Sequence, residues 1–139
     1  MPSAHIDTFA RDNLPPPDQL PVFLFDLPEL QFPEQLNCAS ELLDRHIAEG
    51  HGDRMCLRSP TVRWTYADLQ DKANRIAQVL VSDMGVVPGN RVLLRGPNHP
   101  MAVACWFAVM KAGGIAVATM PLLRAKELKT MIEIAQISH

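Results

Sequence analysis

The stretch from Pro88 to Leu128 constrains the fold more than any other part of the sequence. Two short runs rich in Val, Ile, Leu and Ala, at residues 91–95 and 115–120, flank an apolar segment that begins at Pro100 and ends at a double glycine. The second run follows the first after roughly twenty residues, the spacing of two parallel strands joined by one crossover helix. Because parallel strands are normally buried on both faces, the pattern predicts an α/β fold with a parallel sheet covered by helices.

The segment between the two runs has the features of a buried helix. Pro100 suits the first turn of a helix, where its missing N–H has no intrahelical partner. Residues 101–110 are apolar on nearly every side, so we expect this helix to be buried between the sheet and another layer. We accordingly interpret Trp106 and Phe107 as core residues and not as the walls of a ligand site.

The part of the chain before Pro88 is predicted to contain a helix over residues 37–50, a hairpin of runs 54–57 and 62–64, and a second helix. This second helix begins at Thr65, whose hydroxyl is placed to form a capping box with Asp68. Its expected apolar face consists of Leu69, Ala73, Ile76, Leu80 and Met84.

Residues 1–36 form a separate, proline-rich segment. Six of the twelve prolines fall between residues 15 and 33, a density that forbids long helices and predicts an extended arm. The arm is nevertheless rich in Phe and Leu, so we expect it to lie against the domain and bury its aromatic side chains there. A proline-rich recognition motif is a weaker interpretation, because such motifs seldom carry so many Phe residues.

Residues 37–139 are therefore read as one α/β domain, and as an incomplete one. The last segment, residues 126–139, resembles a helix. In a repeated βαβ pattern the next strand would follow directly after it. We expect the chain to be a fragment, with the missing strand adding beside residues 115–120. The exposed sheet edge left there predicts self-association.

Composition excludes several classes of protein. The net charge of −2, with Lys and Arg scattered along the chain, gives no basic surface for nucleic acid or an anionic membrane. The three cysteines form no CxxC pair, which favours reduced thiols in a cytoplasmic protein. No basic and then apolar signal segment opens the chain, and residues 101–110 are about half as long as a bilayer span.

Two histidines are candidate metal ligands. His46 and His51 flank the predicted helix end near Gly50, but no third ligand was recognised beside them. The simpler interpretation is a pair of partly exposed imidazoles at a helix end. No metal site is therefore predicted.

Motifs for nucleotide binding and catalysis are missing from the sequence. It contains no GxGxxG, no GxxxxGK[ST], no GxSxG and no HExxH. Residues 95–99 stand where a helix N-terminus in a βαβ unit can bind phosphate, but every βα connection has this polarity. His99 has no partner carboxylate or nucleophile nearby, so we interpret it as a surface residue or, with Asn98 as the other candidate, as the helix cap, and we assign no catalytic residue.

Several motifs resemble a known family. The run TYADLQDKANRIA at residues 65–77 and the stretch 88–128 are similar to the adenylate-forming acyl-CoA synthetases of the AMP-dependent synthetase and ligase superfamily. Asn90 replaces the Asp common in the family's turn. More narrowly, HIDTFARDNLPP, FDLPELQFPEQLNCASELLDRH and ATMPLLRAKEL resemble aryl-CoA ligases that act on 2-aminobenzoate, relatives of the benzoate-CoA ligases.

The resemblance implies an activity for a parent enzyme. That enzyme would join an aromatic carboxylate to ATP as an acyl-adenylate and pass the acyl group to coenzyme A, with ATP, Mg²⁺ and coenzyme A as cofactors. The family's catalytic motifs match nothing up to His139, so we expect the fragment to be inactive, to bind none of these cofactors tightly and to act with the remainder of the ligase chain. The alternative is a stand-alone α/β interaction module derived from a ligase.

The resemblance also implies one contact. In related aryl-CoA ligases a basic residue after the second parallel strand meets the phosphates of coenzyme A, and Arg124 or Lys126 occupies that stretch. Arg124 is the candidate, because a guanidinium offers phosphate a forked pair of donors. A solvated cation at a helix start is the simpler interpretation.

Overall fold

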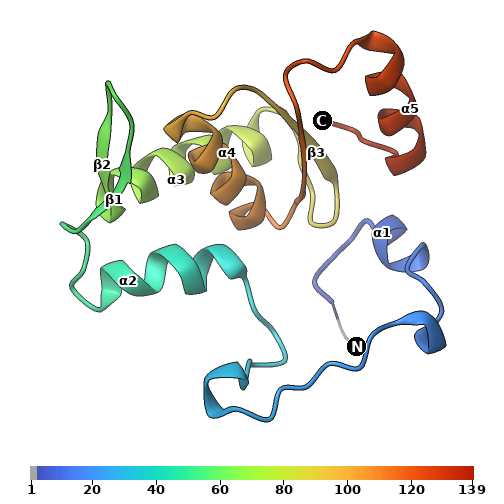
Figure 1. Ribbon diagram of the computed structural model, residues 1–139, viewed down its shortest axis with the longest axis horizontal. Coiled ribbons are helices and arrows are strands. Elements are labelled where there is room, and N and C mark those ends of the chain that lie inside the picture. Colours follow the sequence, from blue (N-terminus) through green and yellow to red (C-terminus); the bar gives the residue numbers. More distant parts are fainter. Residues whose placement is uncertain (1–2) are drawn as a thin grey trace.

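The computed structural model describes residues 3–139 (Figure 1). It contains two sheets of two strands each, one antiparallel and one parallel. The helices are α1 Phe9–Asp12, α2 Arg45–Ala48, α3 Tyr66–Ser82, α4 Pro100–Lys111 and α5 Ala125–Ala135; a π-helical turn, Ser40–Asp44, leads into α2; and the strands are β1 Met55–Arg58, β2 Arg63–Thr65, β3 Arg91–Arg95 and β4 Ile115–Thr119. Within the described residues no helix is both long and apolar enough to cross a membrane.

The predicted βαβ unit is confirmed. β3 and β4 pair in parallel from Arg91 opposite Ile115 to Arg95 opposite Thr119, and α4 makes the crossover. Val92 points from β3 toward α3 and α4, where apolar side chains of all these elements form one buried cluster. Its buried members are Leu80, Val86, Val92, Ala108, Val109 and Ala112.

The other face of the parallel sheet carries different neighbours. Successive side chains on a strand point to opposite faces, so Arg91 points away from the cluster around Val92. Its guanidinium reaches the end of α5, which lies with α1 on the opposite side of β3 from α3 and α4 (Figure 1). Leu93 and Val117 share this second face and stay partly exposed. The predicted sheet covered by helices is confirmed, but its two faces differ: the α3–α4 face carries the buried apolar cluster, while α5 and α1 cover the second face mainly at Arg91.

The helix α3 begins as predicted. Thr65 Oγ1 accepts a hydrogen bond from the Asp68 N–H at 3.2 Å, and Asp68 Oδ2 accepts one from the Thr65 N–H at 2.9 Å. The first half of α3 packs against the helical segment before α2 and against α4, burying Leu43, Leu69, Ala73 and Ala104. Met84 was assigned to the same apolar face, but it lies beyond the end of α3 and is 48% exposed.

The segment from Asn37 to the hairpin also follows the prediction. Asn37 caps the helical turns, since its Oδ1 accepts the Ala39 N–H at 2.9 Å while its Nδ2 donates to the Met110 carbonyl at 2.8 Å. Gly50, at φ +82°, ends α2 in the left-handed conformation. β1 and β2 then form the expected antiparallel hairpin.

The helix α4 is less buried than predicted. Met101 and Trp106 are each 40% exposed, because they lie on the side of α4 turned away from α3, the parallel strands and the segment around Leu43. The assignment of Trp106 to the core is wrong. Phe107 is partly buried against the cluster of Leu43, Leu69, Ala73 and Ala104, which fits its predicted role.

The proline-rich arm does not bury its aromatic side chains. Phe23, Phe25 and Phe32 are 64%, 49% and 56% exposed and contact one another instead, with ring centroids about 6 Å apart. The segment between α1 and α2 runs along the outside of the molecule (Figure 1). Only the start of the arm docks on the domain, where the N–H groups of Ile6 and Asp7 donate to the Pro88 carbonyl at 2.9 and 3.0 Å.

The last residues lie beside β3. The Ser138 N–H donates to the Arg91 carbonyl at 3.3 Å, and the Leu93 N–H donates to the His139 carbonyl at 2.8 Å. The chain after α5 therefore adds to the free edge of β3, and not beside residues 115–120 as expected. Since α4 leads from β3 to β4 and α5 leads back past β3, right-handed crossovers place these two helices on opposite faces.

Candidate functional site

A crevice opens at the carboxyl ends of the two parallel strands. The loop after β3 leads to α4 on one face of the sheet, and the loop after β4 leads to α5 on the other. Adjacent parallel strands whose connections leave to opposite faces create the position where open α/β sheets commonly bind ligands. A cavity of about 680 Å³ lies there, lined by residues 93–99, 101–103, 105–106 and 118–119.

The polar side chains of this crevice hold its loops. Arg95 Nη2 donates to the carbonyls of Pro121 and Leu123 at 2.6 and 3.0 Å, which ties the loop after β4 to the end of β3. His99 is the N-cap of α4, its Nδ1 accepting the Met101 N–H at 3.1 Å. The predicted cap role of His99 is confirmed, and Arg95 and His99, the two basic side chains of the stretch 95–99, have structural partners.

Cys105 is the thiol of the crevice. Burial raises its pKa above the ordinary value of 9.0, so the group is protonated at neutral pH and is a poor nucleophile. Burial likewise raises the pKa of Cys56, whose Sγ donates to the Trp64 carbonyl at 3.4 Å. All three cysteines are free thiols, as the spacing predicts.

Arg124 and Lys126 lie just beyond the crevice, at the start of α5. Both are exposed. Arg124 is the N-cap residue, and its backbone N–H donates to Glu127 Oε2 at 2.9 Å. Arg124 therefore stands at the same end of the sheet as the crevice.

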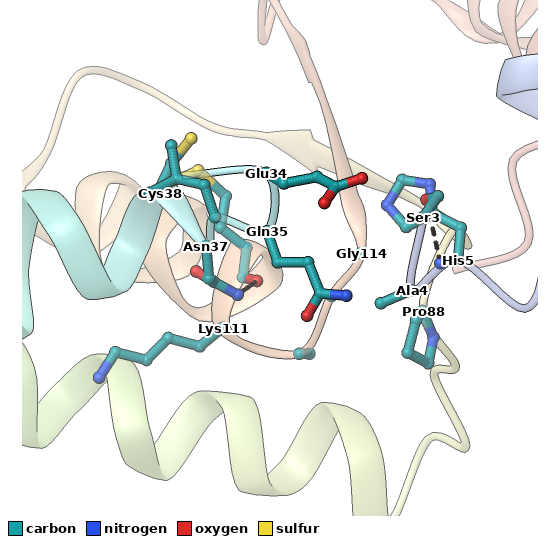
Figure 2. Close-up of a pocket in the computed structure, with 14 residues that line it drawn as sticks. Ser3, Ala4, His5, Glu34, Gln35, Asn37, Cys38, Pro88, Lys111 and Gly114 are labelled. Carbon is teal, nitrogen blue, oxygen red and sulfur yellow. Dashed lines mark hydrogen bonds between the residues drawn. The ribbon is translucent and has the colours of Figure 1, made fainter. Parts of the chain in front are cut away.

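A second pocket, of about 600 Å³, lies at the amino ends of the same strands (Figure 2). The arm forms one wall with His5 and Glu34, while Pro88 and Gly114 form the other. Figure 2 shows the Lys111 amine pointing away from His5, and it donates instead to Asp44 and Asn74. The pocket is a gap between the arm and the domain, and Figure 2 shows the Glu34 carboxylate turned toward His5 within it.

The structure adds a residue to the histidine pair at the end of α2. Glu49 lies with His46 and His51 so that one ligand atom from each falls within 4.8 Å of the others. The sequence interpretation overlooked this third ligand, although Glu49 stands between the two histidines in HIAEGH. A Glu three residues after a His on the same helix was the available signal.

Comparisons with known proteins agree on one family. The family described as AMP-binding enzyme matches residues 44–139. The chain is 30% identical over 108 residues to the acetyl-coenzyme A synthetase of Mycolicibacterium smegmatis, covering 73% of this chain and 11% of that protein. It is 42% identical over 64 residues to the salicyl-AMP ligase / salicyl-S-ArCP synthetase of Mycobacterium tuberculosis, covering 46% of this chain and 11% of that protein.

A solved structure supports the same fold. The anthranilate CoA ligase AuaEII, in complex with anthranoyl-AMP, superimposes with a TM-score of 0.70 and 24% identity over 76% of this chain and 20% of that chain. The present chain thus spans only a small part of the proteins it matches. Since the family's pattern extends over residues 44–139, including both sheets and the crevice, the chain belongs to the AMP-binding enzyme family.

Proposed function

We propose that the chain is the amino-terminal part of the adenylation domain of an aryl-CoA ligase, and that the whole enzyme acts on 2-aminobenzoate. The observation that carries the proposal is the β3–α4–β4 unit with its crevice, in the sequence context of the AMP-binding family. The aromatic substrate is supported by the arm and loop motifs, and by similarity to proteins described as an anthranilate CoA ligase and a salicyl-AMP ligase.

The proposed reaction overcomes the low reactivity of a carboxylate. A carboxylate oxygen attacks the α-phosphorus of ATP, and pyrophosphate leaves. The thiolate of coenzyme A then attacks the acyl carbon of the adenylate, and AMP leaves. The chain has no glycine-rich or hydroxyl-rich phosphate loop, so binding of ATP and Mg²⁺ falls to the remainder of the ligase, while residues 37–139 shape the scaffold beside it.

Pyrophosphate exchange tests the proposal. The enzyme encoded by the extended reading frame should exchange labelled pyrophosphate into ATP with 2-aminobenzoate, faster than with salicylate, benzoate or acetate. The 139-residue chain alone should show no exchange. Exchange that is fastest with acetate would overturn the aromatic assignment, and robust exchange by the 139-residue chain would overturn its scaffold role.

Arg124 is proposed to contact the phosphates of coenzyme A in that enzyme. Arg124→Ala should raise the KM for coenzyme A roughly tenfold, the loss of one charged hydrogen-bonded contact, and leave pyrophosphate exchange unchanged. Lys129→Ala is the matched control, an exposed cation on α5 that pairs with Glu133 at 3.7 Å. Equal KM values for coenzyme A in the two variants would contradict the proposed contact.

A further inference from the structure

We propose that the end of α2 binds one divalent transition-metal ion through His46, Glu49 and His51. One ligand atom from each residue lies within 4.8 Å of the other two. All three come from one helix end and the turn after it, so the site does not depend on how the rest of the molecule is arranged. It lies apart from the crevice and from the proposed ligase chemistry.

An unsatisfied nitrogen is the second observation that points to a ligand. Nδ1 of His51 is buried and has no hydrogen-bond partner. It lies 3.8 Å from Glu49 Oε2, too far for a hydrogen bond. Two ligand atoms on a tetrahedral Zn²⁺ at its usual bond lengths lie about 3.4 Å apart, so a shift of a few tenths of an ångström brings this pair to the spacing an ion requires.

Neighbouring groups already orient the ligands. Arg45 Nε pairs with Glu49 Oε1 at 3.2 Å, which leaves Oε2 turned to His51. The ring of His46 packs against Tyr66, with centroids 5.0 Å apart. The His51 N–H donates to the His46 carbonyl at 2.9 Å and closes the turn. Because the turn is formed before any ion arrives, little conformational entropy is lost on binding.

The donor set selects the type of ion. Two imidazoles and one carboxylate suit Zn²⁺, Co²⁺ or Ni²⁺, whereas Mg²⁺ and Ca²⁺ prefer oxygen ligands alone. Three protein ligands leave at least one position for water. The side chains of His51 and Glu49 are 32% and 46% exposed, so an ion reaches the site from solvent. Bound metal ties the end of α2 to the turn that leads into β1 and stabilises the fold by mass action.

Cobalt titration of the 139-residue chain tests the site. Co²⁺ should bind with a stoichiometry of one and give visible d–d absorption, which Zn²⁺ should abolish by displacement. His51→Ala and Glu49→Gln should each weaken binding roughly tenfold or more, since each removes a ligand. Saturating Zn²⁺ should raise the Tm of the unmodified chain but not that of His51→Ala.

Matched variants keep the test decisive. His139→Ala removes an imidazole that contacts the Met84 carbonyl elsewhere in the molecule and should leave the Co²⁺ affinity unchanged. Glu49→Gln keeps the size of an exposed side chain, so its circular dichroism should match that of the unmodified chain and exclude misfolding as the cause of lost binding. Absence of Co²⁺ absorption at millimolar metal, or equal affinity in Glu49→Gln and His139→Ala, would overturn the site.

Discussion

The two arginines of β3 lie at opposite ends of the strand and differ in burial and in the number of groups they bind. Arg91, at the amino end, is 5% exposed and bonds to Asp7, Gly89, Ala135 and Gln136. Arg95, at the carboxyl end, is exposed and donates to two carbonyls of the loop after β4. The amino end of β3 is built around a buried cation, beside the pocket between arm and domain, and we call it the closed end. The carboxyl end carries an exposed arginine beside the crevice, and we call it the open end.

The difference shows how the fold separates stability from ligand access. A buried guanidinium needs hydrogen-bond partners, and Arg91 finds them in the carbonyls of Gly89, Ala135 and Gln136 and in the Asp7 carboxylate. The face of the Phe9 ring lies 4.8 Å from Cζ of Arg91. The open end instead offers apolar walls and loops that a single exposed side chain restrains. We expect substitutions at the two ends to differ in size accordingly.

The largest expected effect is that of Arg91→Ala. Removing one partner of a buried, hydrogen-bonded ion pair should lower the free energy of unfolding by about 3 kcal/mol. Arg95→Ala, the matched variant at the open end, should cost less than about 1 kcal/mol because its bonds are exposed. Urea unfolding followed by circular dichroism measures both, and equal losses would break the comparison.

The next effect concerns two glycines at the same two ends. Gly89 has φ +93°, and a Cβ there would lie 2.1 Å from the Asp7 carbonyl oxygen. Gly89→Ala should therefore lower the free energy of unfolding by about 2 kcal/mol and detach the arm from the domain. A Cβ on Gly96 meets no atom within 4 Å, so Gly96→Ala should change stability by less than about 0.5 kcal/mol. Limited proteolysis of the arm reports its release, which should occur in Gly89→Ala alone.

A smaller effect should appear with pH at the closed end. The hydrogen bond from Arg91, followed by the bond from the Phe9 N–H, holds the pKa of Asp7 below its ordinary value of 3.8. The carboxylate therefore stabilises the fold above that ordinary value, and this stabilisation is lost as pH falls through the lowered pKa. Asp7→Asn should have a lower free energy of unfolding than the unmodified chain at pH 7. The difference between the two free energies should decrease between about pH 5 and pH 2. Urea unfolding at each pH measures this difference, and a difference that does not change with pH would show that Asp7 does not act through its charge.

The smallest effect should appear in self-association. Within residues 3–139 the outer edge of β4 has no strand partner, and Met120 and Leu122 beyond it are 62% and 84% exposed. We expect weak dimerisation there, which Leu122→Glu should weaken severalfold, by about 1 kcal/mol. Val22→Glu, at an 86% exposed position in the arm, is the control. Sedimentation equilibrium measures both, and a strict monomer at all concentrations would contradict the prediction.

Local signals made much of the fold predictable from sequence. The capping box of Thr65 and Asp68, the start of α4 at Pro100 and the two parallel strands each depend on residues close together in the chain. The role of Arg91 could not be predicted, because its partners Asp7 and Gln136 lie 84 and 45 residues away. The residues next to an arginine in a strand do not indicate that its side chain will be buried against carbonyls from distant segments.

The wrong predictions of burial for the arm and for α4 have a related cause. Apolar residues in the arm and on α4 were expected to be buried, yet Phe25 and Trp106 have no second layer against them. Composition shows that a side chain favours burial, but it does not show what is available to cover it. The sequence predicts the crevice only as a position in a βαβ unit, since its walls come from β3, α4 and β4, which meet only in the folded chain.

The contact between Arg91 and Asp7 also sets an order of events during synthesis. Asp7 leaves the ribosome 84 residues before its partner, which at usual elongation rates is a delay of roughly 4 to 17 seconds. Throughout that interval the arm has no docking surface, because Arg91 has not yet left the ribosome. The arm, although made before the domain, is therefore fixed after β3 is made, and its exposed phenylalanines are available to chaperones until then.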